Sequence, residues 1–117
     1  RIYLVDDHKL FREGLKLLLS TQDFVRHIYE ASNGREFIEN LSFVDCDVVL
    51  MDITMPERNG LEATKDITEY DPTATVIMVS ALGQQDKVFT AIANGAKDFV
   101  VKPFEPDKII QCISKYI

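Results

Sequence analysis

Short apolar segments that alternate with segments of helical periodicity constrain this fold more than any other sequence feature. Strands are predicted at Ile2–Val5, Arg26–Ala31, Val48–Met51, Thr75–Val79 and Phe99–Val101. Three of them are continuous aliphatic runs, which is typical of strands that helices cover on both faces. The second contains charged side chains and is predicted to be an edge strand. Strands that alternate with helices in this way predict a parallel sheet built from strand–helix units.

Five helices are predicted between and after these strands. Three show an apolar stripe at helical spacing, formed by Phe11, Gly14, Leu15, Leu18 and Leu19, by Val88, Ala91, Ile92 and Gly95, and by Ile109, Ile110, Ile113 and Ile117. Two weaker helices are predicted at 34–43 and 60–70, each preceded by an Asn-Gly pair, and a third such pair at 94–95 indicates a helix stop. The pattern predicts a doubly wound α/β domain of three layers. Ligands of such folds bind outside the carboxyl ends of the strands.

Composition excludes several classes of protein. With 117 residues and no internal repeat or linker, the chain is expected to form one domain over 1–117. Its longest apolar runs are four residues and no signal pattern opens it, so a membrane or secreted protein is not expected. The net charge of −6 argues against direct binding to nucleic acid. Cys46 and Cys112 lie far apart, which favours reduced, structural thiols in a cytoplasmic protein.

Polar side chains follow four of the five predicted strands. Asp6 and Asp7 come after the first, Asp52 after the third, Ser80 after the fourth and Lys102 after the fifth. Because the carboxyl ends of parallel strands share one edge, these residues are expected to converge in one crevice.

Three neighbouring carboxylates repel one another and require a cation. Lys102 supplies one positive charge, and the remaining oxygens suit Mg²⁺, or Mn²⁺ in its place. No His or Cys ligand for zinc is expected there. His8 follows the acidic pair and could approach the site, but a surface or capping role is favoured. A carboxylate beside such an ion can act as a nucleophile on a phosphoryl group, which yields an aspartyl phosphate.

Five motifs resemble the receiver domain of two-component response regulators, the CheY-like fold, over the full length of the chain. They are Val5-Asp6-Asp7, the segment 51–56 with Gly60, Val79-Ser80-Ala81, the segment 95–99 and Lys102-Pro103-Phe104. Each motif alone is weak, but the ordered set is highly specific. The resemblance implies a flavodoxin/CheY-like (βα)5 sandwich with strand order 2-1-3-4-5.

The resemblance also implies residue roles. Asp52 would be the phosphoacceptor, Mg²⁺ would be held by Asp6, Asp7, Asp52 and the Thr54 backbone carbonyl, and Lys102 would contact the phosphoryl group. Ser80 would bond a phosphoryl oxygen and Phe99 would then turn inward, changing the surface of roughly residues 84–117. Such a domain accepts its phosphoryl group from a sensor histidine kinase or a phosphotransfer protein. It controls a downstream protein or its own output domain.

Two departures from the commonest pattern of that family affect the expected behaviour. The switch aromatic is Phe99 rather than Tyr, so ring burial remains but reporting through a hydroxyl does not. Thr54 and Leu82, two residues after Asp52 and Ser80, have no acid or amide that could orient a water molecule. Self-dephosphorylation is therefore expected to be slow, and beyond it and self-phosphorylation no enzyme activity is expected.

Two alternative functions agree less well with the sequence. A Mg²⁺-dependent phosphatase or dehalogenase with an Asp nucleophile usually has Asp-x-Asp on its first strand and a cap domain, whereas here the two aspartates are adjacent and the chain has no room for a cap. A flavodoxin-like FMN binder needs a phosphate-binding loop after the first strand, where this chain has the acidic pair Asp6-Asp7. Both are disfavoured. Residues 5–15 resemble regulators with a C-terminal helix-turn-helix, so the sequence leaves open whether the chain is the front of a DNA-binding regulator. A phosphorylation-dependent homodimer is also left open.

Overall fold

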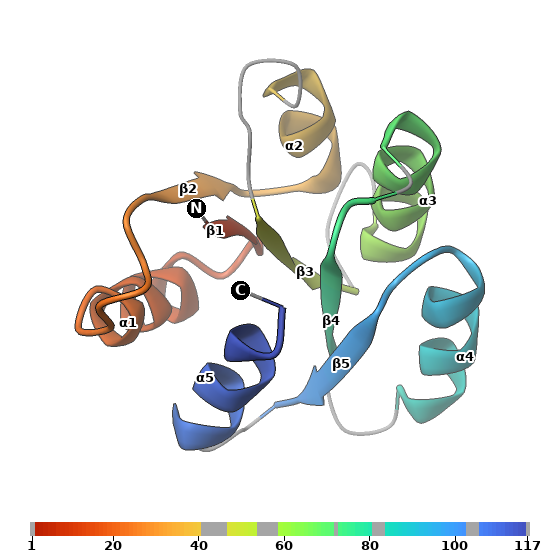
Figure 1. Ribbon diagram of the computed structural model, residues 1–117. Coiled ribbons are helices and arrows are strands. Elements are labelled where there is room, and N and C mark those ends of the chain that lie inside the picture. Colours follow the sequence, from red (N-terminus) through yellow and green to blue (C-terminus); the bar gives the residue numbers. More distant parts are fainter. Residues whose placement is uncertain are drawn as a thin grey trace.

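The computed structural model describes residues 2–40, 47–53, 59–71, 73–80, 84–102 and 106–116. The strands are β1 (Ile2–Val5), β2 (Ile28–Ala31), β3 (Val48–Asp52), β4 (Val76–Ser80) and β5 (Asp98–Val101). They form one parallel sheet in the order β2-β1-β3-β4-β5, as predicted (Figure 1). The helices are α1 (Lys9–Leu19), α2 (Gly34–Asn40), α3 (Gly60–Tyr70), α4 (Gln85–Ala93) and α5 (Pro106–Ser114). None of the helices in these ranges is long and apolar enough to cross a bilayer.

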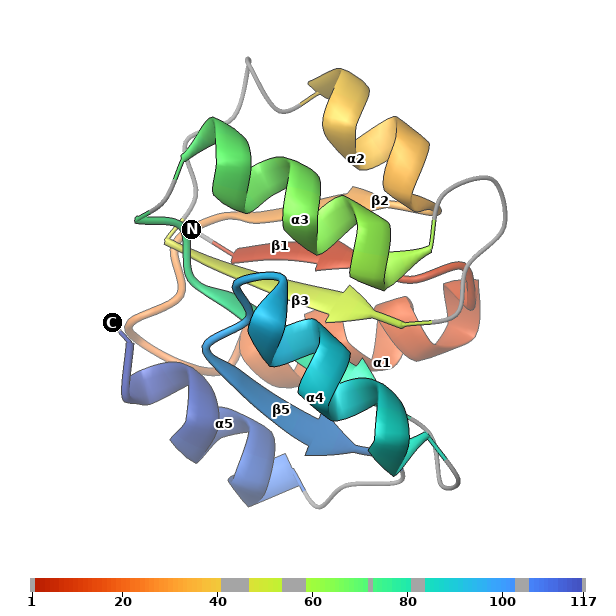
Figure 2. The same cartoon turned by 90° about the vertical axis from the view of Figure 1, so that its right-hand side faces the viewer.

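Helices cover both faces of the sheet, which gives the three predicted layers. α1 and α5 lie on one face and α2, α3 and α4 on the other (Figures 1 and 2). Alternate side chains of each strand enter opposite cores: Ile2 and Leu4 of β1 pack with α1 and α5, whereas Tyr3 and Val5 pack with the other three helices. Burial on both sides explains why the central strands are continuously apolar.

Element boundaries differ from the predictions at a few positions. β2 begins at Ile28 rather than Arg26, because Arg26 and His27 are exposed and pairing starts at the bond from the Ile2 N–H to the His27 carbonyl. β3 and β4 each continue by one residue, so Asp52 and Ser80 belong to the strands. The predicted helix end at 41–43 and Ile117 lie outside the described residues.

The stripe predicted for α4 is only partly correct. Ala91 is buried, but Ile92 is 46 % exposed, and Gly95 lies beyond the helix with a φ of 114°. The predicted helix stop at Asn94-Gly95 is confirmed, because a left-handed residue after the last turn is a common way for a helix to end.

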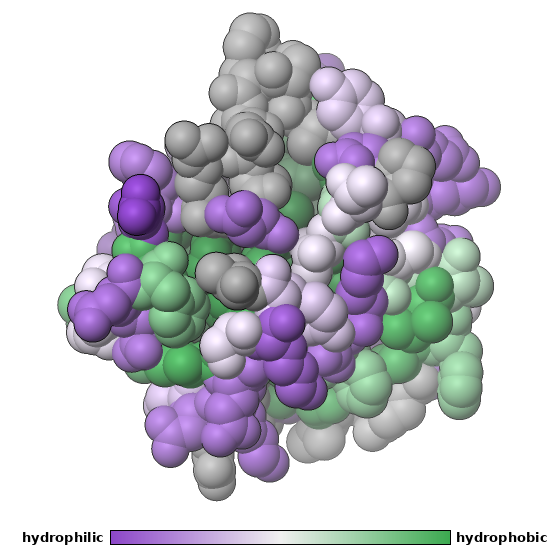
Figure 3. All heavy atoms as spheres, viewed as in Figure 1, coloured by the Kyte–Doolittle hydropathy of each residue, from purple (hydrophilic) through white to green (hydrophobic). Residues whose placement is uncertain are grey.

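The end of the molecule that carries both termini faces the viewer in Figure 3. Hydrophilic side chains occupy the middle of this face, and hydrophobic ones gather over α1 and α4. Leu17 of α1 and Phe89 of α4 are among the exposed apolar residues. The opposite end, at the right of Figure 2, is the carboxyl edge of the sheet.

Candidate functional site

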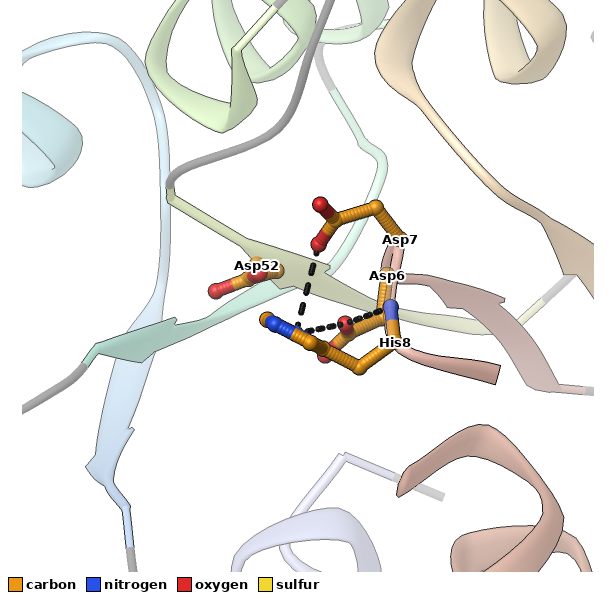
Figure 4. A group of neighbouring side chains, drawn as sticks. All are labelled: Asp6, Asp7, His8 and Asp52. Atoms are coloured by element: carbon orange, nitrogen blue, oxygen red, sulfur yellow. Dashed lines mark hydrogen bonds and ion pairs between the residues drawn. The ribbon is translucent and has the colours of Figure 1, made fainter. Parts of the chain in front are cut away.

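The carboxyl edge of the sheet brings the predicted acidic residues together. Asp6 and Asp7 follow β1, and Asp52 ends β3, the strand that pairs with β1. Asp6, Asp7, His8 and Asp52 each offer a ligand atom, and these atoms lie within 4.8 Å of one another (Figure 4). Convergence of side chains 45 residues apart is a consequence of the parallel topology.

Asp6 is buried and has a partner at every polar atom. Its N–H donates to the Ala31 carbonyl on β2 (3.1 Å), and its own carbonyl accepts from the Arg12 guanidinium. One carboxylate oxygen accepts from the His8 N–H (2.8 Å) and the other from Lys102 Nζ (3.0 Å). Hydrogen bonds with residues of β2 and α1 and with Lys102 after β5 therefore fix the turn between β1 and α1.

Asp52 is the second buried carboxyl of the site, with 6 % of its surface exposed. Burial raises the pKa of Asp52 to about 6, the nearby Asp6 carboxylate adds to the rise, and Lys102 opposes it. Lys102 Nζ lies 3.8 Å from Asp52 Oδ1. One ammonium does not balance this group of carboxylates, so a further cation would stabilise the charged form of Asp52.

Lys102 joins the acidic cluster from β5. Its ammonium contacts Asp6 and Asp52 and lies 4.0 Å from the centre of the Phe11 ring, over its face. Its backbone N–H donates to the Ser80 carbonyl (2.7 Å) at the end of β4. The aromatic contact was not predicted, since helical spacing assigned Phe11 only to the apolar stripe of α1. A cation over an aromatic face is favourable and limits where the ammonium can move.

His8 corrects the sequence analysis. Its side chain is 66 % exposed and it is the N-cap residue of α1 without a side-chain capping bond. However, Nδ1 lies 3.1 Å from Asp6 Oδ1 and 3.3 Å from Asp7 Oδ1, so an imidazole does stand at the acidic cluster (Figure 4). The sequence indicates this contact only by the position of His8 directly after Asp6-Asp7.

Gly60 allows the start of α3 to pack against the backbone of Asp52. A Cβ at this position would lie 1.9 Å from the Asp52 carbonyl oxygen, and the Gly60 N–H donates to the Ile53 carbonyl (2.8 Å). Asn59 caps α3 by accepting a bond from the Glu62 N–H (3.0 Å). The start of α3 is thereby fixed directly against the backbone of Asp52.

The two predicted switch residues lie on neighbouring strands. Ser80 is buried, and its Oγ donates to the Val100 carbonyl at 3.4 Å, the long end of the hydrogen-bond range. Phe99 on β5 is 43 % exposed, and its N–H donates to Asp98 Oδ1. Thr54 and Leu82 lie outside the described residues, as does Cys46, while Cys112 is a buried free thiol.

The donor set fits a hard divalent cation. Asp6, Asp7 and Asp52 supply carboxylate oxygens, the ligands that Mg²⁺ and Mn²⁺ prefer. Burial, and after it the neighbouring Asp6 carboxylate, raises the pKa of Asp52, and a bound cation would oppose both effects. His8 places one nitrogen ligand at the cluster, contrary to the expectation that none is available. The three carboxylates still favour an ion that prefers oxygen ligands.

Comparison with known proteins assigns the chain to a family. Residues 2–114 match the response regulator receiver domain. The chain is a response regulator receiver domain. It is 44 % identical to the chemotaxis protein CheY of Thermotoga maritima over 115 residues, which cover 98 % of this chain and 95 % of the relative. CheY of Bacillus subtilis shows the same identity and coverage.

Other relatives and solved structures agree with this assignment. The nitrate/nitrite response regulator NarL of Escherichia coli is 33 % identical over 96 % of this chain, which spans 52 % of that protein. The response regulator domain of Thermotoga maritima CheB superposes with a TM-score of 0.90 at 31 % identity and covers 99 % of this chain and 94 % of that domain. This receiver domain is thus a phosphorylation-controlled switch of a two-component system, and the CheY-like fold is confirmed.

Proposed function

We propose that Asp52 is the phosphoacceptor of this receiver domain. The observation that carries the proposal is its position: a buried carboxyl at the end of the central strand β3, facing Asp6 and Lys102. A carboxylate oxygen of Asp52 attacks the phosphorus of a phosphohistidine on a sensor histidine kinase or phosphotransfer protein. The new O–P bond forms as the P–N bond breaks, and the imidazole leaves.

Asp6, Asp7, Asp52 and the Thr54 carbonyl would hold Mg²⁺, or Mn²⁺ in its place. When bound, the ion neutralises the carboxylates and the charge of the incoming phosphoryl group. Lys102, kept in place by Asp6 and the Phe11 ring, would place its ammonium against a phosphoryl oxygen.

Phosphorylation would reach the surface through Ser80 and Phe99. The bond from the Ser80 hydroxyl to the Val100 carbonyl is long, so exchanging that bond for one to a phosphoryl oxygen would cost little. Phe99 would then turn inward and change the surface formed by α4, β5 and α5, where Phe89 is 82 % exposed. That surface would act on a downstream protein or an output domain, with a phosphorylation-dependent homodimer as one form of output.

The domain would catalyse only its own phosphorylation and a slow self-dephosphorylation, in the cytoplasm, where its buried Cys112 thiol stays reduced. We propose that residues 1–117 act as one receiver domain and bind no nucleic acid directly.

The test is intact mass after incubation with acetyl phosphate, in Mg²⁺ and in EDTA, for the wild type and Asp52→Asn. We expect a gain of one phosphoryl group in the wild type with Mg²⁺ and none in the other three samples. A gain in Asp52→Asn would overturn the assignment of the phosphoacceptor. Repeated turnover of small phosphate esters would instead support the phosphatase alternative.

A further inference from the structure

Arg12 is a partly buried cation that the proposed chemistry does not use. Its side chain is 13 % exposed although it lies on α1, a helix with one face in water. Its guanidinium donates to the backbone carbonyl of Asp6 and, through Nε, to Glu30 Oε1 on β2 (3.2 Å). It therefore joins an edge strand to the turn that carries Asp6 and Asp7.

Glu30 fixes the orientation of Arg12. Lys16 Nζ contacts the second carboxylate oxygen of Glu30 (3.0 Å), so the carboxylate is shared between two cations. Burial tends to raise the pKa of Glu30, but hydrogen bonds from Lys16 and Arg12 outweigh it and hold that pKa below its usual value. The charged Glu30 and the guanidinium of Arg12 form an ion pair.

The contact with Asp6 is made to its backbone rather than to its carboxylate. Arg12 thus leaves both carboxylate oxygens of Asp6 to His8 N–H and Lys102, and restrains the direction in which the turn leaves β1. Asp7 is the next residue, so the same restraint acts on the backbone that carries its carboxylate.

We infer that Arg12 is a positioning residue for the divalent cation, acting through the Asp6 carbonyl on the spacing between Asp7 and Asp52. The inference rests on the proposed function, because it takes these carboxylates as ligands. Residues that orient metal ligands typically change metal affinity by about 10- to 100-fold when they are replaced.

The experiment measures Mg²⁺ binding by calorimetry, with thermal unfolding as the check on folding, for the wild type and Arg12→Met. Lys16→Met is the matched control, because Lys16 contacts the same Glu30 carboxylate but not the turn. We expect Arg12→Met to weaken Mg²⁺ binding about tenfold, and Lys16→Met to bind as the wild type does. The phosphorylation defect of Arg12→Met with acetyl phosphate should recover as Mg²⁺ is raised. Because Mg²⁺ also stabilises the folded state, thermal unfolding without the ion must show that Arg12→Met is folded at the assay temperature.

Equal affinity in the wild type and folded Arg12→Met would overturn the inference. So would an equal loss in Lys16→Met, because the effect would then belong to the charge network. If Arg12→Met does not fold, Arg12→Lys is measured in its place. Lysine keeps the positive charge opposite Glu30 but lacks the guanidinium geometry that reaches two acceptors at once. Wild-type Mg²⁺ affinity in Arg12→Lys would overturn the inference. A wild-type protein that binds no Mg²⁺ would overturn the metal site itself, and this inference with it.

Discussion

At the scale of single residues, the charge of Asp52 governs the site. Its pKa of about 6 means that, without a divalent cation, the folded state holds the ionised carboxyl at a cost. The free energy of unfolding therefore falls as pH rises through the folded pKa, because the unfolded chain ionises this group more easily.

Asp52→Asn removes this cost. In EDTA at about pH 8 we expect the variant to exceed the wild type in free energy of unfolding by about 2 to 3 kcal/mol, and near pH 4 to lose most of that advantage. Urea unfolding at the two pH values measures the difference. Mg²⁺ should reduce it, since the ion stabilises the wild type. A difference independent of pH would contradict the raised pKa.

We expect the side chain at position 82, here Leu82, to affect the lifetime of the phosphoryl group on Asp52. A carboxylate in place of Leu82 could orient the attacking water molecule, so Leu82→Glu should shorten the half-life of the aspartyl phosphate several-fold. The measurement is loss of phosphoryl mass with time after the donor is removed. Leu82→Met serves as the apolar control, and a half-life lengthened by Leu82→Glu would refute the prediction of slow self-dephosphorylation.

At the scale of elements, the start of α3 positions β3. Gly60→Ala places a methyl group 1.9 Å from the Asp52 carbonyl oxygen, and the backbone has to shift. We expect destabilisation of about 1 to 3 kcal/mol and slower phosphorylation of Asp52, measured by urea unfolding and by mass.

Gly14→Ala is the matched control for Gly60→Ala. Gly14 is an exposed residue inside α1, and a Cβ there would have no atom within 4 Å. Alanine should stabilise the helix by about 0.5 to 1 kcal/mol. If both variants changed stability in the same direction, the close approach at Gly60 would not explain the loss.

At the scale of the whole molecule, the strands β4 and β5 connect the site to the proposed output surface formed by α4, β5 and α5. Ser80 contacts Val100 across this pair, one residue from Phe99 on the chain. We therefore expect a change at Ser80 to reach β5 directly through this contact.

Phe99 should become protected when Asp52 is phosphorylated. Its ring is 43 % exposed, and hydroxyl-radical labelling of it should fall several-fold in acetyl phosphate with Mg²⁺. Tyr70, 67 % exposed at the end of α3, should keep its labelling and serves as the control. Protection of Phe99 that persists in Ser80→Ala would show that Ser80 does not transmit the change.

Several local features could be predicted because they depend on neighbouring residues. The 60–70 helix has the predicted bounds, since Asn59 and Gly60 determine its start locally. The predicted start of β2 at Arg26 was wrong, because strand pairing rather than composition decides where a strand begins.

The sequence by itself determined the order of strands and helices, the edge where polar residues gather, and the family, because periodicity, turn residues and motifs are local patterns. Only the tertiary structure decided which side chains meet. The ammonium of Lys102 over Phe11, His8 beside the carboxylates, and Arg12 between Glu30 and the Asp6 carbonyl join separate elements or depend on the course of a turn. Such contacts follow from how layers pack, and no periodicity in the chain encodes them.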